Sequence, residues 1–109
     1  MKIFHKFGAV RCEADGIKFG SKLERNYYLK LMEAKKDGSL IMFLRQVTFH
    51  LDGNIRYVID FVEFWKTEEE GAAEIKFTDV KGLATDIYKL KKKLVESEYP
   101  IKINEVFKV

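Results

Sequence analysis

The sequence predicts one α/β (α+β) domain over residues 1–109, in which a β-hairpin precedes elements in the order α-β-β-β-α-β. Two segments repeat apolar residues at helical spacing, and three β-rich runs lie between them. The length of 109 residues suits one hydrophobic core but not two. Hydrophobic residues make up 47% and charged residues 34%, a balance typical of a folded chain.

The first third of the chain predicts an arm, a hairpin and a helix. Residues 1–8 are expected to form a loose basic arm, and residues 9–19 a hairpin that turns at Asp15-Gly16, a favoured two-residue turn. Ser21 begins a helix, and Asp37-Gly38 ends it, since glycine commonly follows a helix. The predicted buried face of this helix consists of Leu23, Tyr27, Leu31 and Ala34.

Strands are expected over residues 40–51, 55–65 and 73–81, separated by the turn Asp52-Gly-Asn54 and by the charged tip of residues 66–71. A second helix follows Gly82 and Thr85 and stops at Pro100. Its predicted apolar stripe consists of Ile87, Leu90 and Leu94. A last short strand is indicated by Ile101, Ile103, Val106 and Phe107. Aromatic residues such as Phe61, Phe64, Trp65 and Phe107 are expected mostly in the core.

Two carboxylates are predicted to meet on neighbouring strands. If the second hairpin centres between Glu69 and Glu70, equal counting from its tip places Asp60 opposite Asp79. Opposed residues of an antiparallel pair have Cβ atoms about 5 Å apart, a separation that one divalent cation can bridge. Lys81 falls on the same strand face as Asp79, because side chains alternate with period two.

The Asp79-Val-Lys81 pattern is weak alone, because roughly two such matches are expected by chance in a chain this charged. A plain Asp60–Lys81 salt bridge at the sheet end is the alternative, since ion-pair networks imitate functional sites. Glu24 is a third candidate acid. It completes a capping box with Ser21, and that role and a site role are compatible.

A basic surface is expected around the second helix, which carries Lys89, Lys91, Lys92 and Lys93. Such a run is commonly a solvated face. Near the acids, however, its lysines suit the phosphates of a nucleic-acid backbone. His5, Lys6 and Arg11 extend the same predicted surface. The net charge of +3 fits nucleic acid without requiring it.

Several classes of protein are excluded or disfavoured by composition. The single Cys12 rules out an internal disulfide. The chain has neither a signal-peptide pattern nor an apolar run of membrane-spanning length. A cytoplasmic protein with no membrane partner is therefore expected. There is no phosphate-binding loop or dinucleotide fingerprint, so no nucleotide cofactor is expected. Cysteine and histidine are too few for zinc, and no serine has a nucleophile-elbow context.

Taken together, the motifs resemble the PD-(D/E)XK nuclease superfamily. More closely, the chain is similar to a small family of bacteriophage proteins catalogued as a domain of unknown function within it. The matching residues are Asp15-Gly-Ile-Lys-Phe19, Ser21-Lys-x-Glu24, Arg45-Gln46 with Phe49, Tyr57-Val-x-Asp60-Phe61, Asp79-Val-Lys-Gly82, and Thr85 with Tyr88, Leu90-Lys91 and Lys93-Leu94. The chain departs at Ile59, where a proline is frequent, and at Thr78, where the phage family usually has an acid. By strand alternation Thr78 faces away from Asp79.

The resemblance implies a restriction-endonuclease-like fold with a mixed sheet flanked by helices. It implies that Glu24, Asp60 and Asp79 bind Mg²⁺ together with the Val80 carbonyl, with Mn²⁺ as a substitute. Lys81 would orient the attacking water or stabilise charge on the phosphate, and Gln46 would approach the site or the DNA.

The implied function is a Mg²⁺-dependent endonuclease acting on branched DNA or a Holliday junction in phage recombination or replication. The protein would act as a homodimer in the host cytoplasm. The alternative, motivated by Thr78 and the small size, is a non-catalytic nucleic-acid-binding or regulatory protein that keeps the fold without the chemistry.

Overall fold

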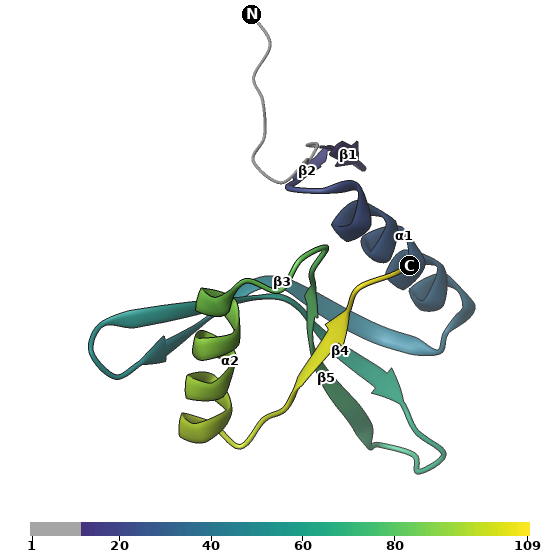
Figure 1. Cartoon of the computed structure of the whole chain (residues 1–109). Coiled ribbons are helices and arrows are strands. Elements are labelled where there is room, and N and C mark those ends of the chain that lie inside the picture. The colour runs from purple at the N-terminus through teal and green to yellow at the C-terminus, as the bar shows by residue number, and fades with distance from the viewer. Residues whose placement is uncertain (1–11) are drawn as a thin grey trace, which may run out of the picture.

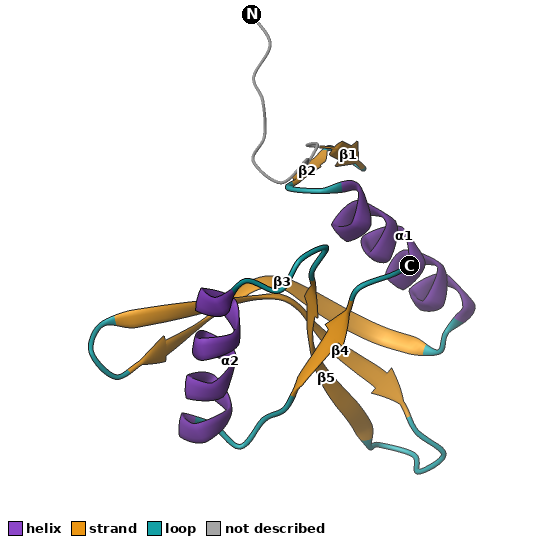
Figure 2. Ribbon diagram, viewed as in Figure 1, coloured by secondary structure: helices purple, strands orange, loops and turns teal. Residues whose placement is uncertain are grey.

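The computed structural model describes residues 12–109. They form a mixed α+β fold in which a four-stranded sheet is flanked by helices and an antiparallel hairpin lies at the N-terminal end (Figure 1, Figure 2). The elements are β1 (Cys12–Ala14), β2 (Ile17–Phe19), α1 (Lys22–Asp37), β3 (Leu40–Leu51), β4 (Ile55–Lys66), β5 (Ala73–Val80), α2 (Asp86–Glu98) and β6 (Ile103–Val106). The predicted order of elements is confirmed within this range.

Local sequence explains where both helices begin and where the first one ends. The side chain of Ser21 accepts a hydrogen bond from the Glu24 backbone N–H at 3.1 Å, and Thr85 does the same for Tyr88 at 3.1 Å. Gly38 ends α1 with φ 91°, a left-handed conformation that glycine adopts without strain. The helix boundaries therefore follow the capping residues that the sequence predicts.

The sheet has the strand order β3-β4-β5-β6. Neighbours β3, β4 and β5 are antiparallel, whereas β6 runs parallel to β5 and is reached through α2. In the β4–β5 pair, Phe61 lies opposite Thr78 and Trp65 lies opposite Glu74. This is the register expected from a hairpin centred between Glu69 and Glu70. The pairing ends at Phe61 and Thr78, and Asp60 and Asp79 are the next residues on the two strands.

Side-chain alternation breaks in the middle of β4. Ile59 belongs to the buried cluster that includes Val95 of α2, whereas Phe61, two residues later, belongs to the cluster that includes Leu31 of α1. Residues two apart on a regular strand share one face. On β3, the residue beside this break is Gln46, whose φ of 52° is unusual for a residue other than glycine. Asp60 therefore lies at the boundary between two cores.

The apolar stripe predicted for α2 is wrong at Ile87 and Leu90 and is confirmed at Leu94, which packs against the core. Ile87 and Leu90 are 69% and 59% exposed, and the helix packs on the sheet through Tyr88 and Val95. Lys91 and Lys92, which lie in the turn between these two contacts, are half-buried. Aliphatic lysine stems can cover apolar surface in this way, so counting apolar residues alone misplaced Ile87 and Leu90.

The core prediction also needs one correction at the C-terminal end. Phe61 is fully buried, and Phe64 and Trp65 pack against the two clusters, but Phe107 is 48% exposed. Phe107 comes directly after β6, which ends at Val106, so the sheet does not fix its side chain in a packed position. Within residues 12–109, no helix is long and apolar enough to cross a membrane.

Candidate active site

The carboxylates of Asp60 and Asp79 are fixed by each other's strands. The Asp60 N–H donates to Asp79 Oδ1 at 3.2 Å, and the Val80 N–H donates to Asp60 Oδ2 at 2.9 Å. Each acid is therefore oriented by a backbone donor on the neighbouring strand. Hydrogen bonds to ionised carboxylates are among the stronger ones in proteins, so this reciprocal pair holds both side chains together at the end of β5.

Both acids lie in surroundings that disfavour negative charge. The Asp79 side chain is fully buried and Asp60 is half-buried. Burial raises the pKa of both carboxyl groups above the usual value, and the negative charge of Glu24 raises the pKa of Asp60 further. The positive charge of Lys81 acts in the opposite direction on both pKa values. Added positive charge at this position would therefore stabilise the ionised pair.

Glu24 joins the acid pair through Gln46. The Gln46 side-chain N–H₂ donates to Glu24 Oε1 at 3.1 Å and to Asp60 Oδ1 at 3.4 Å. Glu24 also lies 4.0 Å from the Arg45 guanidinium, which sits over the ring of Phe19. Of the predicted capping box, the half in which Ser21 accepts from the Glu24 N–H is present. The Glu24 carboxylate instead accepts from Gln46 and belongs to the acid cluster. The involvement of Arg45 was not anticipated.

Lys81 is placed beside the acids but not in direct contact with them. Its backbone N–H donates to the Val106 carbonyl of β6 at 2.9 Å, and its Nζ lies 5.0 Å from the centre of the Tyr88 ring. Within residues 12–109, the ion pairs found within 4.0 Å do not include one between Asp60 and Lys81. The simple salt bridge considered as an alternative is therefore absent from this structure.

Two tyrosines that were not predicted as site residues lie near Asp79. Tyr57 donates a hydrogen bond to Asp79 Oδ2, and Tyr88 donates one to Glu105 at 3.0 Å. Thr78 instead accepts a hydrogen bond from Asn104 at 3.0 Å. Its hydroxyl also lies close enough to Tyr27 of α1 to act on the pKa of that phenol. Thr78 therefore faces away from Asp79, as predicted. Strict alternation would place Tyr57, three residues before Asp60, on the face opposite to Asp60 and Asp79. Its contact with Asp79 accompanies the change of face in β4, which the sequence pattern does not contain.

The predicted basic residues differ in their surroundings. Lys89 and Lys93 are exposed on the same side of α2, and Lys91 is half-buried. Lys92 forms an ion pair with Glu105 at 3.1 Å, so its charge is already partly satisfied. His5, Lys6 and Arg11, together with the predicted arm of residues 1–8, lie outside the described residues.

The donor set is chemically suited to a hard divalent cation. Carboxylate oxygens from Glu24, Asp60 and Asp79 are the ligand type that Mg²⁺ prefers. In this structure a hydrogen-bond donor, the Gln46 amide, bridges two of them, which shows that this position attracts partial positive charge. Within the described residues, however, no three His, Cys, Asp or Glu side chains converge closely enough to hold a metal ion as they stand.

Comparison with known proteins gives one family. Residues 4–108 match the family model described as a protein of unknown function, DUF1064. No curated protein and no solved structure gives a significant match. The inference of function therefore rests on the residues of this chain.

Proposed function

The chain belongs to the DUF1064 family, and from its acid cluster we propose that the protein is a Mg²⁺-dependent endonuclease that hydrolyses phosphodiester bonds in DNA. The observation that carries the proposal is the pair of Asp60 and Asp79 with Lys81 next to it. The Asp60 N–H donates to the Asp79 carboxylate, and the Val80 N–H donates to the Asp60 carboxylate. Two constrained carboxylates and a lysine at one end of a sheet are suited to binding a metal ion and stabilising charge on phosphate.

The same proposal includes a restriction-endonuclease-like topology for the fold. It is supported by the element order from α1 to β6, and by the positions of the two aspartates on the second and third strands of that order. It is also supported by the parallel pairing of β6 with β5 after the crossover through α2.

In this mechanism Glu24, Asp60 and Asp79, with the Val80 carbonyl, would hold the Mg²⁺ ion, and Mn²⁺ would substitute for it. When bound, the ion supplies positive charge that offsets the charge developing on the phosphate. Lys81 contributes a second positive charge at the same place, and its contact with the Tyr88 ring keeps the flexible side chain near the acids. Gln46 keeps Glu24 and Asp60 close together.

The proposed substrate is branched DNA, including Holliday junctions, recognised by shape and charge in phage recombination or replication. An exposed lysine such as Lys89 suits phosphate contacts, which position a protein on nucleic acid without reading sequence. Arginine, which forms the commonest specific contact with guanine, is scarce in the chain.

Replacement of Lys81 by alanine is expected to lower the rate of DNA cleavage by about 10²–10³-fold while leaving DNA binding largely intact. The lysine charge is expected to matter chiefly in the transition state. The assay compares four-way junction, single-stranded and duplex DNA, each with Mg²⁺ or with EDTA, and binding is measured separately in EDTA.

The matched control is Lys36→Ala, which removes an exposed lysine from the last turn of α1. It should cleave like the unmodified protein. Cleavage that persists in EDTA, or that is the same in Lys81→Ala as in the control, would contradict the proposed site.

A second candidate function is a nucleic-acid-binding protein without catalysis. It is favoured by the complete burial of the Asp79 side chain and by the lack, among the described residues, of a ready three-ligand metal group. A Mn²⁺ titration separates the two candidates. If no Mn²⁺ binds at millimolar concentration although the acid pair is intact, the non-catalytic function is the correct one.

We also propose that the protein forms a homodimer through the outer side of α2. Ile87 and Leu90 are highly exposed there, and large exposed apolar side chains that lie together mark contact surfaces. In an antiparallel pairing of two α2 helices about a two-fold axis near Leu90, Asp86 of each copy comes near Lys93 of the other. Opposite charges therefore flank the apolar contact on both sides of the axis.

Leu90→Glu is expected to convert the dimer into a monomer, because it places a negative charge at the centre of the proposed contact. Size-exclusion chromatography with light scattering measures the mass over a range of concentrations. Leu29→Glu, at a residue of α1 that is 42% exposed, is the control and should remain dimeric. A protein that is monomeric before substitution at all concentrations would refute the contact.

A further inference from the structure

We propose that Tyr57 is a positioning residue that holds the Asp79 carboxylate in the orientation needed to bind a divalent cation. The inference rests on the proposed metal site and extends it to a residue outside the acids and the lysine. Its basis is the position of one buried hydroxyl group within the core between the sheet and α2.

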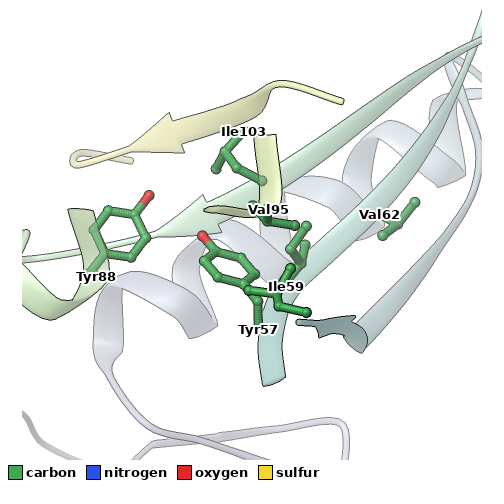
Figure 3. Close-up of a cluster of buried hydrophobic side chains, with 7 residues drawn as sticks. Tyr57, Ile59, Val62, Tyr88, Val95 and Ile103 are labelled. Carbon is green, nitrogen blue, oxygen red and sulfur yellow. The ribbon is translucent and has the colours of Figure 1, made fainter. Parts of the chain in front are cut away.

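The environment of Tyr57 is apolar except at its hydroxyl. The residue is 4% exposed, and its ring lies in the cluster that includes Ile59, Val62 and Val95 (Figure 3). A buried hydroxyl without a partner is costly, so this group needs a hydrogen bond. Its acceptor is Asp79 Oδ2. Burial and the negative charge of Asp79 raise the pKa of Tyr57, so the phenol stays protonated and acts as a donor.

The hydrogen bond from Tyr57 completes a two-point restraint on Asp79. The other carboxylate oxygen, Oδ1, accepts from the Asp60 N–H at 3.2 Å. Both donors belong to β4, and together they fix the plane of the carboxylate on β5. Each oxygen keeps a second lone pair for a cation. Partners that orient a metal ligand in this way typically change metal affinity by about 10–100-fold when they are removed.

A second tyrosine supports the same arrangement from α2. The rings of Tyr57 and Tyr88 lie 6.4 Å apart between centres, and their hydroxyl groups approach each other (Figure 3). Tyr88 is anchored by its hydrogen bond to Glu105 of β6, and Glu105 is held by the ion pair with Lys92. Glu105 is also the register partner of Asp79. The orientation of Asp79 is therefore supported from three elements, β4, α2 and β6.

Tyr57→Phe tests the proposal because it removes the hydroxyl and keeps the ring. Mn²⁺ binding is measured by electron paramagnetic resonance on the full chain without DNA, so the result does not depend on cleavage. We expect the dissociation constant for Mn²⁺ to rise about 10–100-fold. Tyr57→Met, which also lacks the donor, is the second variant if the phenylalanine variant does not fold.

The matched control is Tyr27→Phe. Tyr27 donates a hydrogen bond of 2.7 Å to the buried Glu63, so this variant loses the same kind of phenol–carboxylate contact in the other core. It should bind Mn²⁺ like the unmodified protein, which separates a positioning role from a general loss of stability.

The possible outcomes distinguish this inference from the proposed function. If the unmodified protein binds Mn²⁺ and Tyr57→Phe binds it equally well, the positioning role is wrong and the metal site stands. A loss of affinity of the same size in Tyr27→Phe also overturns it, since the effect would then be general. If the unmodified protein binds no Mn²⁺, the proposed metal site fails, and the inference fails with it.

Discussion

Replacement of Asp79 by asparagine is expected to lower Mg²⁺-dependent DNA cleavage at least ~10³-fold and, at the same time, to raise the thermal stability of the protein at pH 8. The first effect follows because asparagine supplies no negative charge to the proposed metal site. The second follows because Asp79 is fully buried and burial disfavours the negative charge of its carboxylate. Asparagine can still accept the hydrogen bond from the Asp60 N–H, so the local structure is expected to persist.

The pH dependence gives this prediction its sign. Burial raises the pKa of Asp79 in the folded protein above its value in the unfolded chain. Below the unfolded pKa of about 3.9, a carboxyl group with a raised folded pKa makes its full contribution to the free energy of unfolding. That contribution to stability is lost as the pH rises through the folded pKa. The stability advantage of Asp79→Asn over the unmodified protein should therefore be larger at pH 8 than at pH 4, as measured by thermal unfolding.

Magnesium should reverse the order of stabilities. A ligand that binds only the folded state stabilises it, so added Mg²⁺ is expected to raise the melting temperature of the unmodified protein but not that of Asp79→Asn. Asp37→Asn is the control, because hydrogen bonds from Ser39 lower the pKa of Asp37 and no gain at pH 8 is expected there. Cleavage by Asp79→Asn at the normal rate, or a stability gain that does not depend on pH, would disprove this interpretation of the site.

Phe61→Ala is expected to have the largest effect on stability, a loss of about 3–5 kcal/mol in the free energy of unfolding. Phe61 is fully buried between β4 and α1. Its ring centre lies 5.3 Å from that of Tyr27 and 5.9 Å from that of Phe43, in tilted and edge-on contacts. Removal of the ring leaves a cavity that these neighbours cannot close. The loss is a large fraction of the 5–15 kcal/mol typical of a domain.

Urea unfolding monitored by circular dichroism measures the effect. The control is Phe107→Ala, which removes the same ring from a residue that is 48% exposed and should change the stability by less than about 1 kcal/mol. Equal losses in the two variants would mean that the core between β4 and α1 is not packed as described. Since Phe61 follows Asp60 directly, the alanine variant is also expected to weaken Mn²⁺ binding.

Much of the fold could be predicted because it depends on local signals. Ser21, Thr85 and Gly38 define helix ends through their own side chains or backbone freedom. The symmetric hairpin tip at Glu69 and Glu70 sets the register of β4 and β5. The opposed positions of the two aspartates follow from that register alone, and for this reason the centre of the site could be found by counting.

The remaining features of the fold and the site depend on side-chain packing or on irregular backbone conformation. A regular pattern of apolar residues in the sequence does not predict either of these. The left-handed conformation of Gln46 and the change of face at Asp60 break the alternation on which strand predictions rely. Likewise, Tyr88 rather than Ile87 faces the sheet, because half-buried lysine stems complete the contact. The role of Tyr57 depends on the depth of the core, which determines whether its hydroxyl meets water or Asp79.

The parallel pairing of β5 with β6 has a consequence for the order of folding. Asp60 and Asp79 are 19 residues apart and meet when a single hairpin closes, a comparatively local and rapid event. The backbone of Lys81, by contrast, pairs with Val106 only after the whole of α2 has crossed the sheet. During synthesis the acid pair can therefore form while β6 is still in the ribosome, whereas the lysine end of the site is completed only after β6 has emerged.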